Sequence, residues 1–118
     1  MIARPLGIND IIDAVVEASG VSVGEMRGGR RTVEIVNARR AVSILGRRHT
    51  RCSYPEIASA MLGNPQRHSS IIAQERGGIG AMGCGDVDLA LVVARASEIV
   101  ERRRHREVAE RRAKRRKF

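Results

Sequence analysis

The stretch SYPEIASAMLGNPQRHSSIIAQER, residues 53–76, decides the fold because it predicts two short helices joined by a tight turn. Ser53 and Glu56 have the spacing of a capping box at the start of the first helix. Pro55 stands in the first turn, where its missing N–H is not needed. Gly63 follows the last apolar residues of this helix and supplies the turn.

The second helix of the pair, expected over residues 65–76, begins with polar side chains. Asn64 is placed to cap it. Ile71 and Ile72 face the core, which turns the start of the helix toward solvent. The polar residues at this end are Gln66, Arg67, His68, Ser69 and Ser70. Such a pair is typical of a helix-turn-helix, in which the second helix meets the edges of DNA bases.

The remaining sequence predicts further helices, so we expect an all-α fold. Apolar residues recur at helical spacing, and the chain has only one Tyr and one Phe. We expect a first helix capped by Asn9 and ended by Gly20, and a one- or two-turn helix between Ser22 and Gly28. A third helix, over about 33–51, has one apolar face and one basic face. The arginines of the basic face are Arg39, Arg40, Arg47 and Arg48.

Residues 77–85 are rich in glycine. We expect Gly77 and Gly78 to end the second helix of the helix-turn-helix, and residues 77–85 to form a flexible hinge. The pattern Gly-x-Gly-x-x-Gly over 78–83 has the letters of a dinucleotide-binding loop, but that loop needs a preceding strand and a βαβ unit. A helix precedes it here, so the segment is interpreted as a connector between two helical parts.

The C-terminal part, residues 86–118, predicts one long helix that changes character along its length. Residues 87–100 carry an apolar stripe, which could fold back on the domain, form a homodimer or dock on another protein. The rest is strongly basic and could clamp DNA, bind RNA or stay disordered. The expected parts are a helix-turn-helix DNA-binding domain over 8–76, a glycine-rich connector over 77–85, and an amphipathic to basic helix over 86–118.

The net charge of +9 is concentrated in two zones. Residues 27–51 contain eight arginines and a single acid, Glu34. Residues 101–118 contain ten Lys or Arg and three acids. Guanidinium groups match phosphate oxygens in geometry and charge. The charge therefore favours a polyanion as partner, with nucleic acid as the first candidate.

Other classes of function find little support in the sequence. A nucleophilic serine needs a base and an orienting acid, and only Glu75 lies near the polar cluster, so we expect no enzymatic activity. His49 and Cys52 are spaced like metal ligands, but no second pair completes a site, so we expect no metal and no cofactor. Cys52 and Cys84 form no disulfide framework, and no apolar run suggests a membrane span or a signal peptide. A cytoplasmic protein without a membrane partner is expected.

Residues 8–76 resemble the C-terminal DNA-binding domain of the bacterial chromosomal replication initiator DnaA. In that family a short helix and a basic loop precede an arginine-bearing helix, then Ser-Leu-Pro-Glu-Ile-Gly and an Asp-His-Thr-Thr signature. The matching stretches here are 21–26, Arg30-Arg31, Ser-Tyr-Pro-Glu-Ile-Ala at 53–58 and Arg-His-Ser-Ser at 67–70. The resemblance implies a stand-alone helix-turn-helix protein of bacterial, phage or mobile-element origin.

The resemblance also implies roles for single residues. His68 and Ser69 would approach base edges, with Ser70 beside them, and Arg39 and Arg47 would bind phosphates. The minor-groove arginine of the family aligns with Val33, so that role would pass to Arg30 or Arg31. The complete set of expected DNA contacts is Arg30, Arg31, Arg39, Arg40, Arg47, Tyr54, Pro55, Gln66, Arg67, His68, Ser69 and Ser70.

Together these observations predict a non-enzymatic protein that binds double-stranded DNA with residues 65–76 in the major groove, in DNA replication or transcription regulation. Two alternatives stay open at this point. One is an RNA-binding protein that works through its basic tail. The other is an adaptor that docks on a protein partner through residues 87–100.

Overall fold

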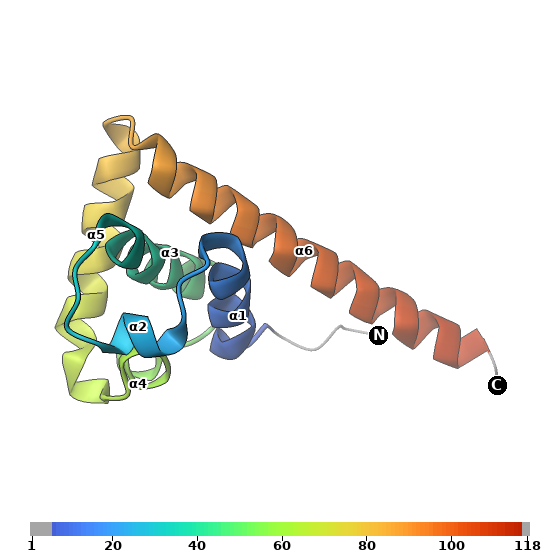
Figure 1. Cartoon of the computed structure of the whole chain (residues 1–118). Helices are drawn as coiled ribbons and strands as arrows, with labels where there is room; N and C mark the ends of the chain where they lie inside the picture. Colours follow the sequence, from blue (N-terminus) through green and yellow to red (C-terminus); the bar gives the residue numbers. More distant parts are fainter. Residues whose placement is uncertain (1–5, 117–118) are drawn as a thin grey trace.

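The computed structural model describes residues 6–116, and all regular structure within that range is helical, which confirms the expected all-α fold. Figure 1 shows how the elements follow one another. They are α1 (Ile8–Ser19), α2 (Val23–Arg27), α3 (Val33–His49), α4 (Tyr54–Leu62), the 3₁₀ turn η1 (Pro65–Arg67), α5 (His68–Gly83) and α6 (Val87–Arg116).

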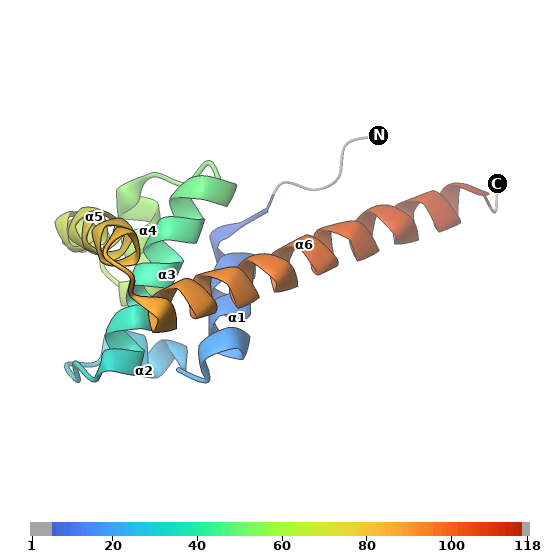
Figure 2. The same ribbon diagram turned by 90° about the horizontal axis from the view of Figure 1, so that it is seen from above.

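Helix α3 lies at the centre of the fold. It contacts α1 and α6 on one side and α5 on the other, and Figures 1 and 2 show this arrangement from two directions. Its apolar residues Ile35, Ala38, Val42 and Leu45 are buried, as the helical spacing predicts. The buried Ser43 hydroxyl donates to Gln74 Oε1 at 2.9 Å, which ties α3 to α5.

Local capping explains where most helices begin. Ser22 and Ser53 form the two expected capping boxes, each with the glutamate three residues later. The hydrogen bonds from Ser53 lower the pKa of Glu56, which keeps its carboxylate ionised at the start of α4. The expected cap at Asn9 is wrong. The cap is Gly7, two residues before Asn9, so helix α1 begins at Ile8, and the Asp10 carboxylate accepts from the Gly7 N–H at 2.9 Å.

The start of the second helix of the helix-turn-helix also differs from expectation. Asn64 does cap this segment, since its side chain accepts from the Gln66 N–H at 2.9 Å. Residues Pro65–Arg67, however, form a 3₁₀ turn, and the α-helix begins only at His68. The expected range of 65–76 therefore joins a 3₁₀ turn to the first part of α5.

The glycine-rich segment is mostly helical, which corrects the expected helix end at Gly77 and Gly78. Helix α5 continues to Gly83, and the chain reverses only after it, where Gly85 takes φ +93°. Gly78 is buried against α3 and lies close to Ile44. Packing against α3 outweighs the low helix propensity of glycine, which costs about 1 kcal/mol per residue relative to alanine.

Helix α6 folds back on the domain. Its residues Leu89, Val93, Ala96 and Val100 are buried in the core, where α6 packs along α1 and α3. The second half of α6 extends beyond the domain, as Figure 1 shows. Within residues 6–116 no single helix is long and apolar enough to span a membrane. The segments Pro65–Gly83 and Val87–Arg115 meet the required length and composition only when they are taken together, and the chain bends by 112° between them.

The crossing of α5 over α3 predicts opposite effects for two glycine substitutions. A Cβ at Gly78 would lie 2.9 Å from Ile44 Cδ1 and 3.2 Å from Arg40 Cβ. Gly78→Ala should therefore lower the free energy of unfolding by about 1 kcal/mol, because overpacking exceeds the gain in helix propensity. Gly80→Ala is the matched control. No described atom lies within 4 Å of its Cβ, so it should raise that free energy by about 0.5–1 kcal/mol. Urea unfolding measures both, and equal effects would contradict the close crossing.

Candidate nucleic-acid interface

The turn between α4 and α5 is held from both sides. Gly63 ends α4 in the left-handed conformation, with φ 76°, which a residue with a side chain rarely adopts. Ile57 and Met61 of α4 and Ile71 of α5 are fully buried, so the two helices share one apolar contact. The pair is thus fixed as a rigid unit, and the N-terminal end of α5 points away from the core.

Polar side chains at that end are open to solvent. Gln66, Arg67, His68 and Ser69 are exposed, and Ser70 is half-buried. The 3₁₀ turn before α5 forms the N-terminal end of this helical segment, and Asn64 caps it by accepting from the Gln66 N–H. A helix N-terminus of this kind suits a phosphate or a base edge.

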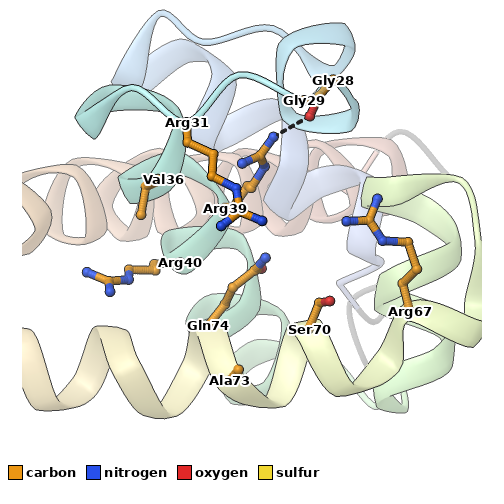
Figure 3. Close-up of a pocket in the computed structure, with 10 residues that line it drawn as sticks. All are labelled: Gly28, Gly29, Arg31, Val36, Arg39, Arg40, Arg67, Ser70, Ala73 and Gln74. Atoms are coloured by element: carbon orange, nitrogen blue, oxygen red, sulfur yellow. Dashed lines mark hydrogen bonds between the residues drawn. The ribbon is translucent and has the colours of Figure 1, made fainter.

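A basic cleft lies beside this end of α5. It has a volume of about 380 Å³ and opens between α5, α3 and the loop after α2, as Figure 3 shows. Its lining residues are Gly28, Gly29, Arg31, Val36, Arg39, Arg40, Arg67, Ser70, Ala73 and Gln74. Five of the expected contact residues therefore line one cleft: Arg31, Arg39, Arg40, Arg67 and Ser70.

The electrostatics of the cleft favour an anion. Partial burial lowers the pKa of Arg39, and the positive charges of Arg31 and Arg67 lower it further. The guanidinium remains charged at neutral pH, because the ordinary pKa of arginine is far higher. No acidic side chain is among the lining residues. Several cations share this small space without a compensating charge, so the cleft attracts a group such as phosphate.

Arg39 has a structural task that the sequence did not reveal. Its guanidinium donates to the carbonyl oxygens of Met26 at 2.8 Å and Gly28 at 2.6 Å. These bonds close the C-terminal end of α2 and fix the loop that carries Arg30 and Arg31. The resemblance implies that Arg39 binds phosphate, whereas the structure gives much of its donor capacity to the backbone.

A second group of expected contacts lies apart from the cleft. The Arg47 guanidinium carbon stands 4.3 Å from the centre of the Tyr54 ring, and Arg47 also donates to the Cys52 carbonyl at 3.0 Å. The Tyr54 hydroxyl donates to Glu75 Oε1 at 2.6 Å, which links the start of α4 to α5. Pro55 is exposed beside them. This group holds the two helices together at their outer side.

The sequence reading missed Arg27. Its guanidinium donates to the carbonyl oxygens of Ala60 at 3.0 Å and Met61 at 3.3 Å, and so covers the C-terminal end of α4. These partners are more than thirty residues away, and backbone carbonyls leave no mark in a sequence. The sequence indicates only that Arg27 is a basic residue in the last turn of α2, and it does not indicate the contact with α4.

His49 ends α3, and Cys52 lies in the loop that follows it. Among residues 6–116 no group of three His, Cys, Asp or Glu side chains is placed to hold a metal ion. Cys52 is partly buried and packs against the core. His49 is partly buried. Burial lowers its pKa, the charge of Glu101 opposes this shift, and the charge of Arg104 adds to it.

The α4–turn–α5 unit, with its exposed polar end, defines a helix-turn-helix protein. The family model described as the bacterial DnaA protein helix-turn-helix matches residues 8–76. The chain therefore belongs to this family, and the resemblance drawn from the sequence is confirmed. No curated protein matches the chain.

Two arginines of the cleft should separate stability from surface charge. Arg39→Gln should lower the free energy of unfolding by about 1–3 kcal/mol, because the carbonyls of α2 lose a charged donor. Arg31→Gln should change it by less than about 0.5 kcal/mol, because Arg31 has no hydrogen-bond or ion-pair partner among residues 6–116. Urea unfolding followed by circular dichroism measures both. An unchanged midpoint for Arg39→Gln would show that the bonds to α2 are not needed.

Proposed function

We propose that this chain is a non-enzymatic protein that binds double-stranded DNA in the bacterial nucleoid, in control of replication or transcription. Residues 65–76, which comprise η1 and the first part of α5, would lie in the major groove. The observation that carries the proposal is the exposed polar end of α5 beside a cleft lined by four arginines. Family membership supports the same class of ligand.

The exposed residues suit the chemistry of base edges. Arg67 is a donor of the kind that pairs with O6 and N7 of guanine. His68 and Ser69 can donate or accept, and both are exposed at the first turn of α5. Ser70 is half-buried and lines the cleft, so it would contact the backbone rather than a base.

The remaining expected contacts divide into two phosphate-binding groups. Arg31 and Arg40 line the cleft on one side of α5. Arg47, near the end of α3, stacks on Tyr54 at the start of α4, next to Pro55 and outside the cleft. A helix inserted in the major groove has a phosphate strand on each side, so the two groups would hold both strands. Arg30 extends the first group along the loop.

Two features weigh against the alternatives. The major groove of duplex RNA is deep and narrow, so a helix such as α5 fits DNA better. The apolar stripe of residues 87–100 is used inside the fold, where Leu89, Val93 and Val100 are buried. An adaptor that docks through this stripe would have to unfold the domain.

Fluorescence anisotropy with a random duplex pool, followed by selection of the preferred site, tests the proposal. His68→Ala should weaken binding to the selected site by about 1–3 kcal/mol and binding to random duplex much less. Arg31→Gln should weaken both and reduce the log–log salt slope by about 0.9, because one phosphate contact is lost.

Arg95→Gln is the matched control, because Arg95 is an exposed arginine of α6 outside the cleft. It should leave the affinity for the selected site close to that of the wild type. Equal binding of RNA and DNA that neither His68→Ala nor Arg31→Gln changes would refute the proposed function.

A further inference from the structure

The second half of α6, residues 101–116, is here called the basic arm. It contains nine Lys or Arg and three Glu, so it carries a large positive charge. The arm continues α6 beyond the part that packs on α1 and α3, and Figure 2 shows it leaving the domain. It is the second of the two basic zones, and the helix-turn-helix does not use it.

Most cations of the arm have no acidic partner. Arg103 is bound to Glu17 of α1 at 3.3 Å, which fixes the root of the arm on the domain. Arg111 pairs with Glu107 at 3.2 Å within the arm. Among the described side chains of the arm, the cations without a hydrogen bond or an ion pair are Arg102, Arg104, Arg106, Arg112, Lys114 and Arg115. A solvated helix that only needed to be soluble would balance these charges with acids.

The charge surrounds the arm instead of forming a stripe. Arg102, Arg103 and Arg104 are consecutive, and each residue of an α-helix is turned by about 100° from the one before. These three alone cover most of the circumference. The apolar residues of the arm are Val108, Ala109 and Ala113, which are too few for a helix-pairing seam. Charge complementarity therefore points to a polyanion as occupant, not to a second copy of the chain.

The arm lies across the molecule from the recognition end of α5. Helix α3 stands between α5 and α6, and α6 passes behind it when the basic cleft faces the viewer, as in Figure 3. The chain turns by 112° between the two helices. With a rise of about 1.5 Å per residue, this angle places the start of α5 and the end of α6 about 40 Å apart.

We propose that the basic arm binds the phosphate backbone of a second DNA duplex, so that one molecule bridges two DNA segments. The inference rests on the proposed function, which places the first duplex on α5. A straight duplex on α5 leaves the arm on the far side of α3. The same duplex would reach it only by bending around the domain, and such bending costs about 1–6 kcal/mol.

A capture assay tests the bridge. A short duplex with one selected site is fixed on beads, and a second, fluorescent duplex without the site is added with the protein. The test variant carries five substitutions in the arm: Arg102→Gln, Arg104→Gln, Arg106→Gln, Arg112→Gln and Arg115→Gln. None of these side chains is buried, so the fold is retained, and circular dichroism checks this. His68→Ala serves as the contrasting variant, because it changes α5 alone.

Wild-type protein should hold the fluorescent duplex on the beads. The arm variant should hold at least about tenfold less, because it loses several phosphate contacts, while its anisotropy with the single short duplex stays close to wild type. His68→Ala should weaken loading on the bead duplex and leave the affinity of the arm for the second duplex unchanged. If His68→Ala does not weaken binding of the protein to the bead-bound duplex, the proposed function fails. The role of the arm is still measured in that case, by the amount of fluorescent duplex that wild type and the arm variant capture.

Three outcomes would overturn the bridge. The arm variant could lose affinity for the single short duplex as much as it loses capture of the fluorescent duplex. That result would mean that the arm binds the same duplex as α5. Preferential capture of a fluorescent RNA would make RNA the occupant. Capture that rises with the square of protein concentration, with a dimer in light scattering, would mean that two copies join the duplexes.

Discussion

The close crossing of α5 over α3 is the constraint on which the rest of the structure depends. Gly78 is buried at the crossing, where a side chain would meet Ile44 and Arg40. Because the helices approach so closely, α5 stays helical through its glycines and the chain turns only after Gly83. Helix α6 therefore starts at the end of α5 remote from the polar cluster and returns across the opposite side of α3. The polar N-terminal end of α5 and the basic arm therefore lie on opposite sides of this contact.

Arginine serves the fold as well as the surface. Arg27, Arg39 and Arg47 each donate to backbone carbonyl oxygens, at the end of α4, the end of α2 and the loop after α3. The last carbonyls of a helix have no partner within it, and a planar guanidinium can satisfy two of them at once. Lysine could not replace this geometry. Part of the high positive charge is thus explained by the helix ends, while Arg31 and Arg67 line the basic cleft without such a carbonyl partner among the described residues.

Local signals gave the predictable part of the fold. Capping at Ser22 and Ser53 depends on neighbours three residues away, so the sequence shows it directly. The exposure of His68 followed from the inward direction of two isoleucines. The predicted end of α5 was wrong because it rested on the low helix propensity of Gly78. The packing partner of Gly78 is Ile44 of α3, which is more than thirty residues away in the sequence. The carbonyl partners of Arg39 belong to the backbone, which has no sequence signature, so only the structure revealed them.

The glycines of α5 also bear on how the protein opens. Glycine at 77, 78, 80 and 83 makes the second half of α5 a poor helix by itself, and the packing of Gly78 against α3 supports it. Its amide hydrogens should exchange with solvent when the α3–α5 contact opens, and not by fraying from the end. Helix α6 follows directly after this half. The turn between α5 and α6 therefore belongs to the same cooperative unit as the core. The second half of α5 and the start of α6 should unfold together with the α3–α5 contact.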